Sequence, residues 1–421
     1  MSVRPFRKVT ALILTALVGT AAAASAAAPA AATTGDQDGL WYYTAAGLDR
    51  AHQTTTGEGI TVAVLDGPIN PAASDLAGTD LVTHEEGLCT REDGTSIPGV
   101  ATDEVAEHGT NVTAVIIGAG TGVGGQPGVR GVAPGATVLH YALNGPDDCW
   151  DIDLAGGIDA AVDAGADIIN ISIGVEPGEG DVEALARAQR EGVIVVTAAP
   201  NTAGTDLGWP GAANGVVTVQ SADANLQLNP EAITSPQLGA VAPGEAIRAL
   251  SWNRGAWDTY RLANGNSYAA PFTAGVLALV WSQHPDATAN QVIQTLLRNT
   301  SGHEGELARD DSWGYGAVSA LGALSADPTT YPDVNPLLLD EPFALPAYAD
   351  VMGDPTPTPA PDVTDESAPP PTVDEAGDDE GSSMVMPLVL GGGALILLAI
   401  VVAVILMARR RPDPTTPRPV P

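Results

Sequence analysis

Short apolar runs alternate with helical segments along the middle of the chain, and this alternation restricts the possible folds more than any other feature. The apolar runs predict strands at residues 60–65, 137–142, 168–173, 193–197 and 216–219. The segments between and after them predict helices at residues 108–118, 154–164, 181–191, 267–283 and 289–298. Strands that are apolar without interruption are buried on both faces. The pattern therefore predicts an α/β fold with a mostly parallel central sheet and helices on both faces.

The N-terminus has the layout of a secretory signal peptide. Basic residues precede an apolar run, and an Ala-rich tract with A-x-A sites follows it. This layout predicts a signal peptide at residues 1–28, with cleavage between about residues 26 and 34. Residues 29–57 then form an N-terminal extension that is too short for a separate domain with its own core. We expect residues 40–53 to remain attached and to pack on the folded domain.

The C-terminus predicts a membrane anchor carried on a stalk. Residues 326–383 become rich in Pro, Thr and acidic side chains, and such a tract cannot bury enough apolar surface to fold. Residues 336–348 are less polar, and we expect them to pack back on the domain. Residues 384–408 are apolar and uncharged, which is long enough for a transmembrane helix. Three arginines follow at once, so residues 409–421 are expected to be a cytoplasmic tail. The predicted protein is a single-pass protein of the cell membrane with its folded domain extracytoplasmic.

Charge and residue spacing exclude several classes of partner. The formal net charge is −34, from 51 acidic and 17 basic side chains. A surface this acidic repels nucleic acid and anionic lipid at long range, so we expect neither as a binding partner. No pair of histidines has metal-ligand spacing, and no acidic loop has the ligand spacing of a calcium site. We therefore expect no metal and no other cofactor.

The chain has two cysteines, Cys89 and Cys149. A zinc site built from thiolates would want more of them, placed closer together. One disulfide between the two suits their spacing, provided that the compartment is oxidising, as the predicted export implies. The alternative is that they are two unrelated buried thiols.

Three polar residues at strand ends and helix starts have the chemistry of nucleophilic catalysis. Asp66 ends a predicted strand, and His108 and Ser267 each stand at the start of a predicted helix. A serine hydroxyl needs an imidazole base, and the imidazole needs a carboxylate that fixes its tautomer. The chain order Asp, His, Ser is one of the known orders for such a triad. Each residue alone also fits a structural role, as a turn residue, a surface histidine or a helix cap, so the prediction depends on their joint context.

Motifs around these residues follow one another in a family-specific order. Residues 62–66 form an aspartate motif, residues 108–110 a histidine motif and residues 267–271 a serine motif. Asn201 follows another apolar strand, at the place of an oxyanion asparagine. Together these motifs make the chain resemble the subtilisin-like serine peptidases of the subtilase family, over a peptidase domain at residues 58–325.

The resemblance implies a role for each matching residue. Asp66, His108 and Ser267 would form the catalytic triad of an endopeptidase that acts through an acyl-enzyme. Asn201 would donate a hydrogen bond to the oxyanion, although it could also be an ordinary loop residue. The substrate, a protein or peptide, would lie along a cleft formed by Ser172, Ile173 and Gly174.

The chain departs from the family pattern beside the catalytic groups. Residues 67–68 are Gly-Pro where the family usually has Thr-Gly or Ser-Gly, and Asn111 replaces a second histidine. Pro200 replaces the usual Gly before the oxyanion asparagine, and Asn266 replaces the usual Thr before the serine. We expect Asn266 to be a turn residue, with an orienting role for the nucleophile loop as the alternative. These departures leave an alternative function for the chain, as a catalytically weak or inactive scaffold that stabilises a membrane secretion complex.

The order of segments narrows the resemblance further. A signal peptide, a short extension, a peptidase domain, a Pro-rich stalk, one spanning helix and a basic tail resemble the mycosins, which are membrane-anchored subtilases of actinobacterial type VII secretion. This resemblance implies the type VII secretion membrane complex as a partner. A general extracellular protease, tethered for wall turnover or nutrition, is the remaining alternative.

Overall fold

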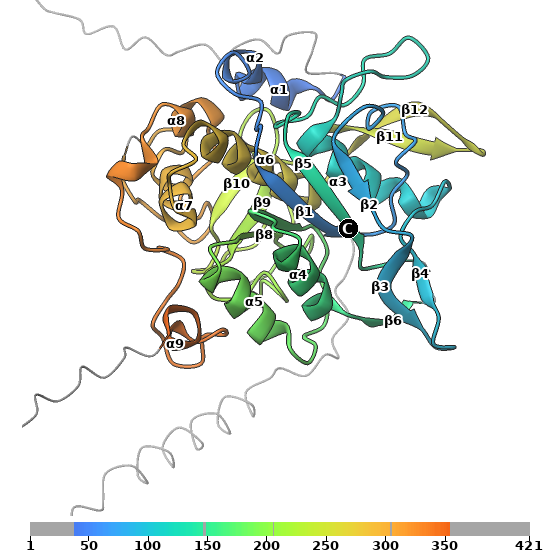
Figure 1. The fold of residues 1–421 in the computed structure, drawn as a ribbon. Coiled ribbons are helices and arrows are strands. Elements are labelled where there is room, and N and C mark those ends of the chain that lie inside the picture. The colour runs from blue at the N-terminus through green and yellow to red at the C-terminus, as the bar shows by residue number, and fades with distance from the viewer. Residues whose placement is uncertain (1–37, 146–148, 205, 304, 354–421) are drawn as a thin grey trace, which may run out of the picture. The chain divides into compact units, whose positions relative to one another are not determined.

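A seven-stranded parallel sheet forms the centre of the computed structural model, which describes residues 38–145, 149–204, 206–303 and 305–353 (Figure 1). The strand order is β10-β9-β8-β7-β1-β5-β2, and each neighbouring pair runs parallel. The strands are β1 (Thr61–Asp66), β2 (Leu81–Thr83), β5 (Thr137–Ala142), β7 (Ile168–Ile171), β8 (Ile194–Ala198), β9 (Val217–Ala222) and β10 (Ala240–Pro243). The predicted parallel α/β arrangement is therefore confirmed.

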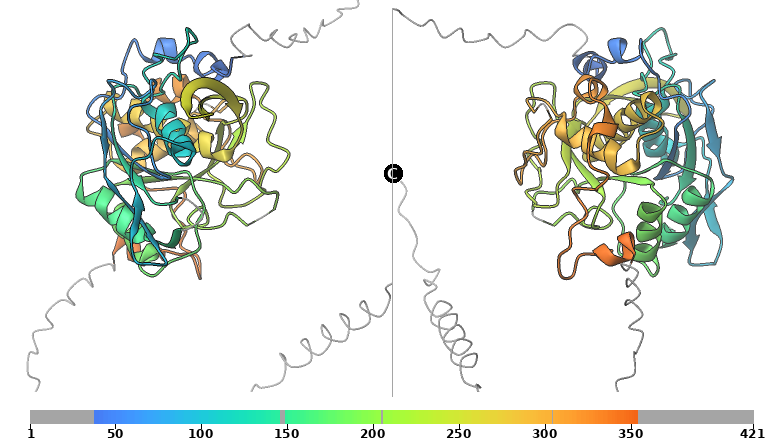
Figure 2. Two further views of the ribbon diagram at one scale, coloured as in Figure 1. Left: turned by 90° about the vertical axis from the view of Figure 1, so that its right-hand side faces the viewer. Right: turned by 60° about the vertical axis from the view of Figure 1, so that its left-hand side comes forward.

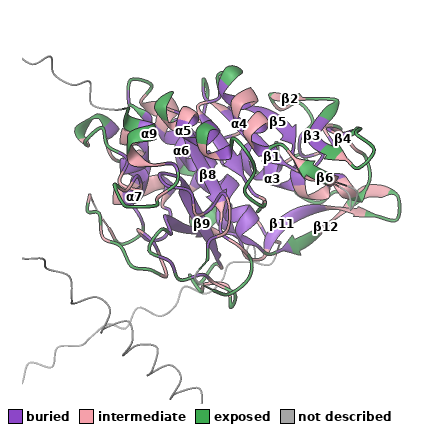
Figure 3. Ribbon diagram, turned by 90° about the horizontal axis from the view of Figure 1, so that it is seen from below, coloured by how far each residue is buried: buried purple, intermediate pink, exposed green. Residues whose placement is uncertain are grey.

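Helices cover both faces of this sheet. On one face lie α3 (Glu107–Ile117) and α6 (Asn266–Gln283), with α7 (Ala289–Arg298) and α8 (Ala320–Leu324) packed beside α6. On the other face lie α4 (Leu154–Asp163) and α5 (Asp181–Arg190). Successive side chains of a strand point to opposite faces, so Val62 and Val64 enter the core under α3 and α6. Ala63 and Leu65 enter the core under α4 and α5. Figure 3 shows most of the central sheet buried, while exposed residues lie mainly on the surrounding loops and at the surface of the helices.

Two smaller sheets lie outside the central one. The first is antiparallel and contains β3 (Glu86–Arg91), β4 (Ser96–Pro98) and β6 (Cys149–Ile152). A disulfide between Cys89 and Cys149 joins β3 to β6, with the two Cα atoms 5.8 Å apart, so the predicted disulfide is confirmed. The second is a hairpin of β11 (Ile247–Asn253) and β12 (Ala256–Ala263). The described residues also contain two short 3-10 turns, η2 (Glu104–Ala106) beside α3 and η3 (Pro328–Thr330) beside α7.

Residues 40–53 of the N-terminal extension pack on the domain, as expected. Its helices α1 (Trp41–Ala45) and α2 (Leu48–Ala51) bury Trp41, Tyr42 and Leu48. The Trp41 indole donates a hydrogen bond to the Glu245 carbonyl at 2.9 Å, and the Tyr42 hydroxyl donates one to the Arg130 carbonyl at 2.6 Å. The extension is thus tied to the domain by polar as well as apolar contacts (Figure 2, blue).

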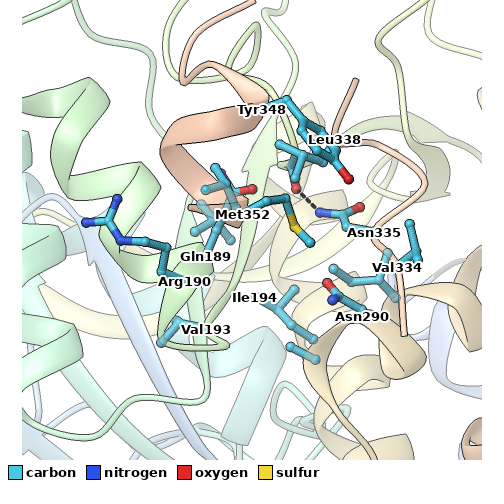
Figure 4. Close-up of a pocket in the computed structure, with 15 residues that line it drawn as sticks. Gln189, Arg190, Val193, Ile194, Asn290, Val334, Asn335, Leu338, Tyr348 and Met352 are labelled. Carbon is cyan, nitrogen blue, oxygen red and sulfur yellow. Dashed lines mark hydrogen bonds between the residues drawn. The ribbon is translucent and has the colours of Figure 1, made fainter. Parts of the chain in front are cut away.

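The last described residues return along the domain to α9 (Tyr348–Met352). Asn214, just before β9, holds them: its amide donates to the carbonyls of Leu339 and Pro346 and accepts from the Leu339 N–H. Figure 4 shows a cavity of about 220 Å³ lined by residues of this segment together with Gln189 and Arg190 of α5, and Arg190 also donates to the Asp350 carbonyl in α9. Residues 336–348 therefore pack back on the domain, as the sequence predicts.

The predicted signal peptide, the spanning segment 384–408 and the tail 409–421 lie outside the described residues. Most of the predicted stalk, beyond residue 353, also lies outside them. Within the ranges that the structure describes, no helix combines the length and the apolar character needed to cross a membrane.

Candidate active site

A cleft of about 350 Å³ opens at the edge of the sheet where β1, β7 and β8 end. It brings together all seven residues that the sequence predicts for catalysis, oxyanion binding and the substrate cleft. The residues that line it are Asp66, Gly67, Val105, His108, Asn144, Gly145, Ser172, Ile173, Gly174, Asn201 and Ser267. The carboxyl ends of parallel strands meet at one edge, which explains how segments far apart in the chain converge here.

Asp66 and His108 form the closest polar contact in the cleft. Asp66 is fully buried at the end of β1, and its Oδ1 accepts a hydrogen bond from His108 Nδ1 at 2.6 Å. The same oxygen accepts a hydrogen bond from the Gly67 N–H at 2.7 Å, so the backbone of the next residue helps to fix the carboxylate. A carboxylate acceptor at Nδ1 fixes the proton of the neutral imidazole on that nitrogen. His108 Nε2 is then left with a lone pair that can accept a proton.

The surroundings of His108 set its pKa. Burial lowers the pKa of the imidazole, but the negative charge of Asp66 and the hydrogen bond to it together outweigh burial. The pKa of His108 is therefore raised above its ordinary value, while the nearby Arg261 guanidinium acts in the opposite direction. An imidazole of this kind can act as a base near neutral pH and also hold the proton that it removes.

Gly109 allows α3 to approach Asp66 closely enough for this contact. A Cβ atom at residue 109 would lie 2.6 Å from the Gly67 carbonyl oxygen and 2.7 Å from that of Pro68. His140 supports the same turn from β5, because its Nε2–H donates to the Gly67 carbonyl at 2.8 Å and its Nδ1 accepts from the Thr113 hydroxyl. Burial lowers the pKa of His140, which keeps it neutral in this role. Sequence reasoning had assigned His140 no function.

The β11–β12 hairpin holds the start of α3 from the outside. Glu107, directly before His108, pairs with Arg261 at 2.6 Å and accepts the Trp252 N–H at 3.1 Å. Asn111, at the place of the usual second histidine, bonds both backbone groups of Leu250 through its side-chain amide. The departure at residue 111 therefore has a structural role, which is to join α3 to β11.

Ser267 and Asn201 face each other across Gly265. Ser267 is the second residue of α6, and the positive end of that helix favours negative charge near it. Gly265 has a φ of +149°, and a Cβ there would lie 3.3 Å from Ser267 Oγ and 3.5 Å from Asn201 Oδ1. Asn201 Oδ1 accepts the Asn266 N–H at 2.9 Å, so the amide leaves Nδ2 as its donor. Pro200 therefore does not keep Asn201 out of the cleft.

The expectation that Asn266 is a turn residue is wrong. Asn266 is the first residue of α6, it is 2% exposed, and its side chain bonds to three backbone groups. Sequence reasoning also missed Val105, Asn144 and Gly145 as part of the cleft. Asn144 and Gly145 directly follow β5, so the rule that sites gather at the carboxyl ends of strands could have found them.

The fold and this cleft together define a subtilisin-like hydrolase. Residues 57–316 match the subtilase family, and because this is more than half of the chain, the chain belongs to that family. It is 30% identical over 271 residues to subtilisin BL of Lederbergia lenta. The aligned region covers 64% of this chain and 91% of that protein. It is 31% identical over 264 residues to a thermostable alkaline protease of Halalkalibacterium halodurans. That aligned region covers 61% of this chain and 66% of the protease.

The fold also matches a solved structure from a secretion system. The crystal structure of MycP1 from the ESX-1 type VII secretion system matches with a TM-score of 0.56 over 70% of this chain and 88% of that chain. The two are 23% identical, so this likeness shows the fold alone.

Proposed function

We propose that the chain is a serine endopeptidase that hydrolyses peptide bonds with Asp66, His108 and Ser267. The observation that carries the proposal is the 2.6 Å hydrogen bond between Asp66 and His108 in the cleft that also holds Ser267 and Asn201. This arrangement puts an oriented imidazole base in the same cleft as a serine at a helix start, which are the groups that nucleophilic catalysis by serine requires.

The groups of the cleft support a complete acyl-transfer sequence. Ser267 Oγ attacks the scissile carbonyl carbon while His108 Nε2 takes its proton, and Asp66 stabilises the imidazolium that results. Asn201 Nδ2 and the Ser267 N–H donate to the oxyanion of the tetrahedral intermediate. His108 then gives its proton to the leaving amine, and the acyl-enzyme remains on Ser267. A water molecule, activated by His108 in the same way, releases the product acid.

The shape of the cleft supports a substrate held as an extended strand. Ser172, Ile173 and Gly174 continue from the end of β7 along the cleft, where a peptide can pair with their backbone. The walls are mostly small or apolar, so we expect a small or medium side chain before the cleaved bond. Cleavage of a mixed peptide library, read by mass spectrometry, tests this expectation against a preference for large or charged residues.

Hydrolysis itself is tested with purified protein and an internally quenched peptide. The wild type should hydrolyse the peptide, and the Ser267→Ala variant should retain only a residual rate several orders of magnitude lower. Equal rates for the two proteins, both folded, would remove the enzymatic proposal and favour the scaffold.

We place the enzyme on the outer side of the cell membrane, on the basis of the predicted signal peptide and the apolar segment 384–408. A chain that ends at residue 383 should appear in the medium, while the full chain should sediment with membranes. Retention of the shortened chain in the membrane fraction would contradict this anchor.

A role with type VII secretion is supported by the order of predicted segments and by the fold shared with MycP1. Deletion in the source organism, followed by complementation with the wild type or with Ser267→Ala, separates the alternatives. Loss of type VII secretion that only the wild type restores supports a processing enzyme. Restoration by both supports a scaffold, and unchanged secretion supports a general extracellular protease.

A further inference from the structure

The side chain of Asn266, directly before Ser267, makes three hydrogen bonds to backbone groups. Its Nδ2 donates to the Ala199 carbonyl at 3.0 Å and to the Pro200 carbonyl at 2.7 Å. Its Oδ1 accepts the Ser221 N–H at 2.7 Å. Both amide hydrogens and the amide oxygen are thus used, in a side chain that is buried.

These bonds join the two halves of the oxyanion site. The two carbonyls belong to the residues directly before Asn201, and the backbone N–H of Asn266 donates to Asn201 itself at 2.9 Å. Residue 266 also directly precedes Ser267. One residue therefore holds the loop that carries the oxyanion amide and the helix that carries the nucleophile at a fixed separation.

We propose that Asn266 is a positioning residue, which sets the distance of Asn201 Nδ2 from the carbonyl that Ser267 attacks. This inference deepens the proposed peptidase function and rests on it. Asn266 does not itself touch the reacting atoms, because its amide is fully used by backbone groups.

The Pro200 carbonyl is one of the two acceptors of Asn266 Nδ2. Proline has no N–H, so its carbonyl is the only backbone group at residue 200 that another residue can bond. A threonine, the usual family residue at 266, has one hydroxyl hydrogen and cannot donate to both carbonyls at once. The two departures from the family pattern, Pro200 and Asn266, are therefore a matched pair.

Asn266 is also anchored to the central sheet, through Ser221. Ser221 lies in β9 and is fully buried, and its hydroxyl donates to the Glu245 carboxylate at 2.5 Å. The Glu245 carbonyl in turn accepts the Trp41 indole N–H. Asn266 is thus fixed to a buried strand of the central sheet, which suits a preorganised oxyanion site.

The decisive variant is Asn266→Asp. It keeps the shape of the side chain and the oxygen that accepts the Ser221 N–H. It replaces the NH₂ group, which donates to two carbonyls, by a carboxylate oxygen that cannot donate. We expect kcat on a quenched peptide to fall about 10- to 100-fold with KM changed by less than about threefold. Complete removal of one oxyanion donor in a subtilisin costs about 10²–10³ in kcat, which sets the upper limit. Unchanged kcat would overturn the proposal.

The same change in an Asn201→Ala background separates positioning from general damage. If Asn266 acts through Asn201, Asn266→Asp should lower kcat little once Asn201 is gone. Multiplied losses in the double variant would overturn the proposal. The peptidase function is judged separately. It stands if the wild type hydrolyses the peptide and Ser267→Ala does not, and it fails if the wild type is as inactive as Ser267→Ala.

Asn214→Asp is the matched control. Asn214 is also buried, its amide also donates to two carbonyls, and its oxygen also accepts one backbone N–H, but it lies before β9, at the opposite end of that strand from the cleft. It should lower the melting temperature without changing kcat below that temperature. A kcat loss equal to that of Asn266→Asp would show a general effect of a buried charge and overturn the proposal.

A rescue experiment covers the case in which Asn266→Asp does not fold. Asn266→Thr alone should lower kcat, and adding Pro200→Gly, which restores both usual family residues, should recover most of the loss. Failure of the second change to recover kcat in a folded protein would contradict the matched pair.

Discussion

His108 Nδ1 lies 2.6 Å from the buried Oδ1 of Asp66, although the two residues are 42 positions apart in the chain. The contact depends on the absence of a side chain at Gly109, since a Cβ there would overlap the carbonyls of the turn that follows Asp66. Asp66 in turn is held by its position at the end of a central strand. The pair is therefore set by the fold and needs no substrate to form.

Replacing Asp66 by Asn tests the orienting role of its carboxylate. Asparagine has a similar shape, but its amide can donate to Nδ1 and so favours the wrong tautomer of His108. We expect kcat to fall about 10⁴-fold, as for the equivalent change in other serine proteases. The control is Asp167→Asn, since Asp167 bonds the Thr61 N–H at the other end of the same strand. That variant should keep its kcat, and an equal loss in both would contradict the assignment.

The pH profile tests the charges around His108. A protonated imidazole cannot accept the serine proton, so kcat/KM should fall as pH drops through the raised pKa of His108. Arg261 lowers that pKa, so Arg261→Gln removes a positive charge, raises the pKa further and should move the acid limb to higher pH.

The control for this shift is Arg254→Gln, which removes the same charge at the exposed tip of the same hairpin. Its acid limb should stay where the wild type has it. If the acid limb of the Arg261→Gln variant moves to lower pH, or does not move, the influence of Arg261 on the pKa of His108 is contradicted.

The disulfide should stabilise the fold. It closes a loop between residues 60 positions apart, and cross-links of this kind contribute about 2–4 kcal/mol, largely by restricting the unfolded chain. The double variant Cys89→Ala/Cys149→Ala should lose about that much free energy of unfolding in a urea titration. Reductant should move the wild type toward the variant and leave the variant unchanged. Equal midpoints for the oxidised wild type and the variant would contradict this contribution.

Five of the seven strands of the central sheet could be predicted because they contain continuous apolar runs, whereas the short edge strands β2 and β10 were missed. Predicted strand 137–142 and helix 289–298 coincide with β5 and α7, and the other predicted elements end within three residues of the observed ones. The site could be predicted in part for the same reason, since Asp66 and Asn201 follow strands that end at one edge. Asn144 follows the same rule and was missed only because no family motif marks it.

Other features depend on contacts that no local pattern contains. Most residues of β12 are half-buried or exposed, although β11 begins with four buried residues, and the pairing of Ile247 with Ala263 decides the register of the two strands. The bonds of Asn266 reach Ser221 and Ala199, which are 45 and 67 positions away. A side chain of this kind reads as a turn residue until the fold brings its partners to it.

Covalent labelling of Ser267 tests the central proposal most directly. A fluorophosphonate reacts with a serine only where a base and an oxyanion site activate it. We expect digestion and mass spectrometry of the labelled wild type to place the adduct on Ser267, and folded Ser267→Ala to carry none. A folded wild type without an adduct, or an adduct on another serine that persists in Ser267→Ala, would contradict the proposal.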